Sequence, residues 1–174
     1  MVKDDTHQND LPRRGNTKSC TMPNTYTQIH IHCIFAVKHR QALITKEWKE
    51  RLHQYITGIV QNHNHKMIAI NSMPDHLHML FGMRPTQSLS DLMRIVKGDS
   101  SEWINNMKLT PGQFRWQEGY GAFSYEKRKI SVVAAYIGNQ ELHHEKKTFL
   151  QEYREFLDNF EIQYDEKYVF REPE

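Results

Sequence analysis

The sequence predicts an α+β fold in which an antiparallel sheet carries helices on one face. Two observations support this class. Strand-like segments alternate apolar and polar residues, and helical segments carry apolar stripes spaced three or four residues apart. These segments follow one another as strand, helix, strand, strand, helix and strand, with helices after them, which is the order of a split βαβ sandwich. At 174 residues, the chain is long enough for one domain with its own hydrophobic core.

The chain divides into a polar leader and a single domain. Residues 1–21 are polar and show no periodicity, so we expect them to be disordered. Residues 22–174 are the expected domain. Its first strand is predicted at 26–37, where apolar side chains occur at every second position. A helix is predicted next, because Thr45 is a suitable N-cap and an apolar stripe continues at helical spacing to Val60.

The middle of the chain predicts two further strands and a second helix. Residues 66–72 and 76–83 are strand-like, and the Pro-Asp pair between them turns the chain. Ser88 is the expected N-cap of the helix, which is predicted to continue to Met107.

The last third predicts a fourth strand and two helices. A Thr-Pro-Gly sequence ends the second helix, and residues 114–117 are predicted to form a short strand. Residues 119–121 are interpreted as a loop because they contain two glycines. A helix is predicted at about 127–147, and another at 148–159.

Composition gives only coarse limits on function. Two cysteines, Cys20 and Cys33, are too few for a disulfide framework, so we expect a reducing, cytoplasmic environment. No apolar run approaches the ~18 residues that would span a bilayer. From Glu141 onward ten acidic and five basic residues give a charge of −5, against a total of +2, so the rest carries +7. A basic body is compatible with a phosphate-bearing partner, but an ordinary solvated surface explains it equally well.

The triplet His76-Leu77-His78 is the sharpest chemical feature. Residues two apart on a strand project from the same face, so both imidazoles would converge while Leu77 enters the core. Two such imidazoles can hold one divalent metal ion. The alternative is a chance pair in a chain with eleven histidines.

Tyr136 and Gln140 form a second candidate pair. If one helix carries both, positions i and i+4 place the phenol beside the amide. The amide oxygen could bind a metal, and a deprotonated phenol could attack phosphorus. The alternative is a partly buried aromatic residue beside a solvated amide. Gly138, which lies between the two residues, weakens a helix by up to ~1 kcal/mol relative to alanine.

Four stretches together resemble a known family. They read PDHLHMLF, WQEGYGAFSYE, AAYIGNQELHH and FLQEYREFLDNFEIQYDEKYVF, and the resemblance runs from about Tyr26 to Phe170. The chain resembles the single-tyrosine HUH transposases, which are the enzymes of insertion sequences that move as single-stranded DNA, and their repeat-associated relatives. The family name describes two histidines separated by a hydrophobic residue.

The resemblance implies specific roles. His76, His78 and Gln140 would bind Mg²⁺ or Mn²⁺, and Tyr136 would be the nucleophile. The implied fold is ferredoxin-like, similar to an RNA-recognition motif, with a C-terminal helix that carries the tyrosine. The implied partners are a second copy of the chain and hairpin-forming single-stranded DNA, with no nucleotide cofactor. Cleavage would form a 5′-phosphotyrosine link that a 3′-hydroxyl later reverses, with the tyrosine helix placed in cis or in trans.

Several other residues are candidates for DNA contacts. Basic side chains after the first strand and on the second helix could bind phosphates, and rings near the glycine-rich loop could stack on unpaired bases. The candidates are Lys38, Arg40, Arg94, Lys97, Tyr120 and Phe123. The alternative for each of them is a solvated charge or a core ring.

Three rival functions share parts of this pattern. A module that only binds single-stranded nucleic acid would not need Tyr136. A metal-dependent hydrolytic nuclease would keep the histidines without a tyrosine nucleophile. A replication-initiating or relaxase nickase has the histidine pair but commonly carries further domains. Tyr136 together with Gln140 favours the transposase.

Overall fold

The computed structural model describes residues 26–144, 147–166 and 169, so the predicted leader lies outside the described residues. In chain order the described elements are β1 (Ile29–Ala36), η1 (Lys38–Arg40), α1 (Lys46–Asn62), β2 (Lys66–Ser72), β3 (His76–Met83), α2 (Leu89–Asn106), β4 (Gly121–Ser124), η2 (Lys127–Lys129), α3 (Ile130–Gly138), α4 (Gln140–His144) and α5 (Phe149–Asn159), where η marks a short 3-10 helix. Within this part of the chain, no helix has the length and apolar character needed to cross a bilayer.

The strands form one antiparallel sheet in the order β2-β3-β1-β4. β1 and β3 are therefore the central pair, and their register places Ala36 opposite His76 and Ile34 opposite His78. This arrangement confirms the predicted α+β class with an antiparallel sheet. It also brings the histidine pair to the middle of the sheet, between β1 and β2.

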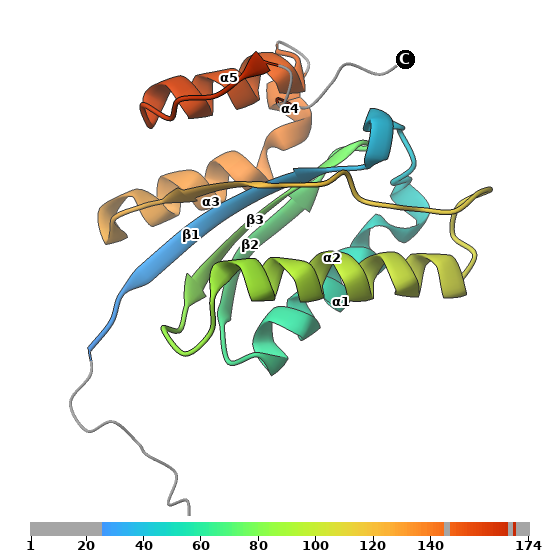
Figure 1. The fold of residues 1–174 in the computed structure, drawn as a ribbon, viewed down its shortest axis with the longest axis horizontal. Coiled ribbons are helices and arrows are strands. Elements are labelled where there is room, and N and C mark those ends of the chain that lie inside the picture. Colours follow the sequence, from blue (N-terminus) through green and yellow to red (C-terminus); the bar gives the residue numbers. More distant parts are fainter. Residues whose placement is uncertain (1–25, 145–146, 167–168, 170–174) are drawn as a thin grey trace, which may run out of the picture.

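Helices cover both faces of the sheet, as Figure 1 shows with the sheet between α1 and α2 on one side and α3 to α5 on the other. Alternate residues of β3 enter the two layers. Leu77 and Phe81 pack in the cluster that includes α1 and α2, whereas Leu80 packs against Ile137 of α3. The expectation that Leu77 would point into a core away from His76 and His78 is confirmed.

The predicted starts of α1, α2 and α5 are correct, although their caps differ. Ser88 accepts a hydrogen bond from the backbone N–H of Asp91 at 3.1 Å, as an N-cap should. Thr45 precedes α1 but makes no such side-chain bond. Thr148 and Gln151 form a reciprocal capping box at the start of α5. α5 therefore has a well-defined N-terminus.

The predicted helix over 127–147 is wrong as one continuous element. α3 ends at Gly138, Asn139 leaves the helical conformation at φ −100° and ψ 22°, and α4 begins at Gln140. Glycine and asparagine both favour the helix weakly. In addition, the Asn71 side chain of β2 donates hydrogen bonds to the carbonyls of Ile137 and Gly138, at 2.8 and 3.3 Å. These bonds satisfy carbonyls that the helix end leaves open.

The fourth strand lies seven residues later than predicted. Residues 114–117 form only an isolated bridge between Trp116 and Val37, whereas β4 begins at Gly121, the last residue of the predicted loop. β4 can pack closely against α5 because residue 121 is a glycine. A Cβ at this position would lie 2.8 Å from the ring of Tyr153, so only glycine fits without a shift.

Burial of the His53 side chain of α1 makes the stability of the fold depend on pH. Its side chain is buried and shares a 2.9 Å hydrogen bond with the Ser72 hydroxyl, and burial lowers the pKa of His53 to about 4. Because the folded pKa lies below the unfolded value of 6.5, protonation favours unfolding. The fold therefore keeps its full stability above pH 6.5 and loses some as the pH falls toward 4.

We expect His53→Gln to reduce this acid sensitivity. Between pH 7.5 and pH 4.5 the variant should lose less unfolding free energy than the parent chain, by up to about 3 kcal/mol. Urea unfolding at the two pH values measures this difference. Other buried histidines contribute the same slope to both proteins and cancel in the comparison. An equal loss in the two proteins would show that His53 does not titrate in this range.

Candidate metal and nucleophile site

Two imidazoles of β3 lie side by side beneath the C-terminal helices. The exposed fractions of His76 and His78 are 1% and 0%, and their ring centroids are 5.2 Å apart. The two side chains lie on the same face of the sheet because residues two apart on a strand point in the same direction. The structure thus places the sequence-predicted pair together in a buried position.

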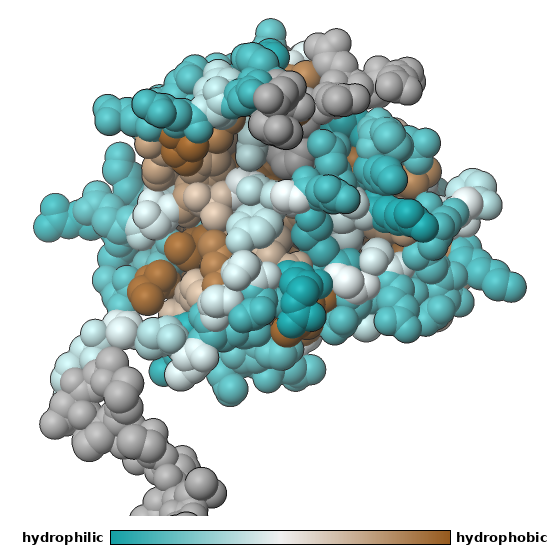
Figure 2. All heavy atoms as spheres, viewed as in Figure 1, coloured by the Kyte–Doolittle hydropathy of each residue, from teal (hydrophilic) through white to brown (hydrophobic). Residues whose placement is uncertain are grey.

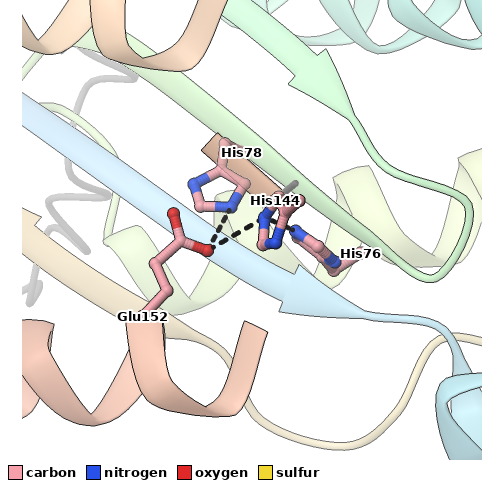
Figure 3. Close-up of side chains that lie close together, drawn as sticks. All are labelled: His76, His78, His144 and Glu152. Carbon is pink, nitrogen blue, oxygen red and sulfur yellow. Dashed lines mark hydrogen bonds and ion pairs between the residues drawn. The ribbon is translucent and has the colours of Figure 1, made fainter. Parts of the chain in front are cut away.

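Two residues that the sequence analysis did not select complete this cluster. His144 of α4 and Glu152 of α5 join His76 and His78, and one potential ligand atom from each of the four lies within 4.8 Å of the others. Figure 3 shows the Glu152 carboxylate pointing toward His78 and His144, with His76 next to His144. The closest pairs are His76 Nε2 with His144 Nε2 at 3.1 Å and His144 Nε2 with Glu152 Oε2 at 3.2 Å.

Neighbouring side chains fix the other nitrogen of each β3 histidine. His76 Nδ1 lies 2.7 Å from Asp75 Oδ1, so Nδ1 carries the proton that it donates to the carboxylate. His78 Nδ1 lies 3.0 Å from His32 Nε2. Such contacts set the tautomer and orientation of metal-binding histidines. They leave Nε2 of His76 and of His78 on the side of the cluster.

Burial keeps these imidazoles neutral. Loss of solvation lowers the pKa of His76 to about 4 and that of His32 to about 3, and it lowers the pKa of His78 well below its usual value. A neutral imidazole has the free lone pair that metal binding requires. Burial acts in the opposite direction on Glu152, where it raises the pKa to about 8, with a further contribution from the charge of Glu155.

Unpaired buried acceptors show that the site fits a cation. His78 Nε2, Gln140 Oε1 and Glu152 Oε2 are inaccessible to solvent and have no hydrogen-bond partner among the described residues. Buried polar atoms without partners are costly, and each of these three types is a recognised metal ligand. A divalent ion in this cluster would satisfy His78 Nε2 and Glu152 Oε2, which belong to one group of potential ligand atoms. Gln140 is completely buried, and its Nε2 donates to Glu152 Oε1 at 3.1 Å.

Tyr136 reaches the same carboxylate from α3. Its hydroxyl donates to Glu152 Oε1, and its ring meets the His78 ring edge to face with centroids 6.4 Å apart. Tyr136 and Gln140 lie on separate helices, so the proposed i, i+4 spacing on one helix is not the reason for their proximity. They meet because both donate to one oxygen of Glu152.

A cavity of about 270 Å³ opens beside the tyrosine. Its walls include aromatic rings of Tyr125, Tyr136 and Phe156 together with the polar side chains of His143 and Asn159. In Figure 2, hydrophobic side chains gather below α5, while hydrophilic ones cover most of the remaining visible surface. A flat, mainly apolar group with polar edges would match such a cavity.

Three of the predicted DNA-contacting residues line one groove. Arg94, Lys97 and Tyr120 face a space of about 470 Å³ that Arg115 also borders. Lys97 additionally donates to the backbone carbonyls of Gln117 and Gly119, at 2.7 and 2.6 Å. Lys97 therefore also holds the loop that forms the groove wall.

The other three predicted DNA contacts are dispersed. Lys38 is exposed and lies beside a separate shallow depression. Arg40 is buried and paired with Asp75, so it supports His76 indirectly and is not free to bind a phosphate. Phe123 is 1% exposed and stacks on Phe156, so its ring cannot stack on a base. Its place on β4 turns it into the core beneath α5.

His144 and Glu152 had only weak sequence signals. His144 ends the run QELHH, which follows the tyrosine closely, but the helix break that directs it inward was not predicted. Glu152 is one of the ten acids counted from Glu141 onward. Its one distinguishing feature is its position between apolar residues of the α5 stripe.

Comparison with known proteins agrees with this picture. Residues 25–140 match the family model described as transposase IS200 like. The ISDra2 transposase TnpA of Deinococcus radiodurans is 25% identical over 119 residues, which covers 65% of this chain and 84% of the relative. The transposase for insertion sequence element IS200 of Salmonella typhimurium is 28% identical over 87 residues, covering 50% of this chain and 56% of the relative.

Solved structures share the fold. A putative transposase from Deinococcus radiodurans superposes with a TM-score of 0.54 at 23% identity, covering 67% of this chain and 93% of that one. A REP-associated tyrosine transposase bound to a REP hairpin gives a TM-score of 0.53 at 14% identity, covering 70% and 72%. The family model matches well over half of the sequence, and this chain belongs to the family of IS200-like transposases.

Proposed function

We propose that this chain cuts and rejoins single-stranded DNA, with Tyr136 as nucleophile and with His76, His78 and Gln140 among the ligands of Mg²⁺ or Mn²⁺. One observation carries the proposal. The Tyr136 hydroxyl and the Gln140 amide both donate to Glu152, whose second oxygen faces the β3 histidines. A phenol and several potential metal-binding atoms thus lie close together, which supports the proposal.

The chemistry follows from these positions. A bound divalent cation would supply positive charge that polarises the scissile phosphate and holds it in line. The Tyr136 oxygen gives up its proton and forms a bond to phosphorus, the bond from phosphorus to the 3′-oxygen breaks, and the released 3′-oxygen takes up a proton to become a hydroxyl. The resulting 5′-phosphotyrosine link is itself a phosphodiester, so the energy of the broken bond is conserved. Attack by another 3′-hydroxyl frees Tyr136 and joins the strands without ATP.

We further propose hairpin-bearing single-stranded DNA ends as the substrate of a homodimer. The described binding of a REP hairpin by one structural relative supports the substrate class. The groove beside Arg94, Lys97 and Arg115 supplies positive charge for a phosphate backbone.

Metal binding should stabilise the fold. At a concentration of 100 times Kd, Mg²⁺ or Mn²⁺ is expected to raise the unfolding midpoint by roughly 5–10 °C, from about 2.7 kcal/mol of linkage. His78→Gln should abolish this increment, whereas His63→Ala, at the end of α1 beyond the opposite face of the sheet, should keep it. Thermal unfolding with and without the ion measures the effect. An unchanged increment in His78→Gln would refute the assigned ligand.

The nucleophile can be tested with labelled DNA hairpins from the ends of the element. With Mn²⁺ or Mg²⁺, a denaturing gel should show a covalent protein–DNA band. Tyr136→Phe keeps the ring but removes the attacking oxygen, so this band should fall to background. Tyr164→Phe, a partly exposed tyrosine, is the matched control. Metal-dependent cleavage that persists in Tyr136→Phe would indicate a hydrolytic nuclease, and binding without cleavage would indicate a non-catalytic module.

The groove predicts a salt-dependent change in affinity. Arg94→Ala with Arg115→Ala should weaken binding of single-stranded DNA at all sequences. The slope of log K against log salt concentration should become shallower by roughly 0.7 for each lost phosphate contact. Lys66→Ala, on the far edge strand β2, is the control of equal charge change for either arginine variant tested alone. Equal slopes for the double variant and the parent chain would show that these arginines do not contact DNA phosphates.

A further inference from the structure

The two oxygens of Glu152 have different surroundings. Oε1 accepts hydrogen bonds from the Tyr136 hydroxyl and from Gln140 Nε2. Oε2 has no hydrogen-bond partner among the described residues, and it faces His144 Nε2 at 3.2 Å and His78 Nε2 at 3.7 Å. Oε1 therefore contacts the proposed nucleophile, and Oε2 faces the cluster of potential ligand atoms.

The packing of α5 holds this carboxylate in place. The helix begins at a capping box, and its residues Phe149, Leu150, Tyr153 and Leu157 are buried in one hydrophobic cluster. Glu152 lies on the same buried side and is only 2% exposed. A carboxylate in such surroundings is unfavourable unless it is hydrogen-bonded or bound to a cation. Among the described residues, hydrogen-bond donors reach only Oε1.

Glu155 differs from Glu152 although it lies on the same helix. It is exposed, and its carboxylate pairs with Lys147 at the surface. The sequence of α5 thus carries two glutamates one helical turn apart, of which one is solvated and the other points to Tyr136 and the histidines. The contrast shows that the position of Glu152 is not a general property of an acidic helix.

We propose that Glu152 is a further metal ligand through Oε2 and, through Oε1, the positioning residue for Tyr136. The inference rests on the proposed function and deepens it. One rigid carboxylate would then join the metal to the nucleophile, so that ion binding and the placement of the phenol oxygen are linked. His144, whose Nε2 adjoins Oε2, would complete the ligand set from the C-terminal side.

The metal half of this proposal is tested without DNA. Isothermal titration of the full-length chain with Mn²⁺ should give a Kd that rises about 10- to 100-fold in Glu152→Gln. Glu152→Gln keeps the shape of the side chain and one acceptor oxygen but replaces the other oxygen with an amide donor, and Glu152→Ala serves as the second variant. Glu155→Gln, which removes the same charge from the same helix, should leave the Kd within about twofold. Equal affinity in the parent chain and both Glu152 variants would overturn the ligand assignment.

The positioning half is tested at saturating Mn²⁺, where ligand loss no longer limits the reaction. Under single-turnover conditions Glu152→Ala should form the phosphotyrosine link about 10²-fold more slowly, as expected for a displaced nucleophile. The Kd for DNA should change less than twofold, which separates positioning from a general structural defect. Full recovery of the rate by excess Mn²⁺ would overturn the positioning role.

The two proposals fail in different ways. If the parent chain forms no covalent link with any metal, the proposed function is wrong, and the Mn²⁺ titration alone decides whether Glu152 is a ligand. If the parent chain forms the link and neither Glu152 variant changes the Mn²⁺ Kd or the rate, the function stands and the role of Glu152 is refuted.

Discussion

The antiparallel pairing of β1 with β3 is the constraint on which the site depends. These central strands are covered on both faces, so each must present two different surfaces. On β3, Leu77, Met79 and Phe81 fill the core shared with α1 and α2, while His76 and His78 take the opposite face. A slip of one residue would exchange the two sets and bury imidazoles among aliphatic side chains. Packing of the core therefore also determines where the histidines lie.

Burial without full pairing determines the charge states of the polar groups in the site. His76 and His78 stay neutral because they are dehydrated, and Asp75 and His32 each engage one nitrogen. The same dehydration raises the pKa of Glu152, because burial favours the uncharged form of an acid as it does that of an imidazole. Ionisation of Glu152 among neutral imidazoles would require a nearby positive charge, which a divalent cation would supply. The apolar face of α5 thus brings an acid to the histidines as a consequence of core packing.

The sequence predicted the parts of the fold that depend on local periodicity. β3 was predicted with its bounds and with both histidines on one face, because a period of two is visible within eight residues. The break at Asn139 was missed because single weak helix formers cost only ~1 kcal/mol, and the bonds from Asn71 that accompany the break come from a distant strand. Convergence of Glu152 on the site likewise depends on the docking of α5. Phe123 was misinterpreted because a four-residue strand offers too little alternation to identify.

The break between α3 and α4 separates the residues of the site into two groups, one on the sheet and α3 and the other on α4 and α5. The Asn71 side chain hydrogen-bonds the end of α3 to the sheet. Tyr136 of α3 is therefore held in a fixed position relative to the histidines of β3. Gln140 and Glu152 belong instead to the C-terminal layer that follows the break. Undocking of that layer would carry Gln140 and Glu152 away from the β3 histidines and leave Tyr136 beside the sheet. The C-terminal layer therefore decides whether the buried polar cluster is assembled, although the sheet and its core with α1 and α2 do not depend on it.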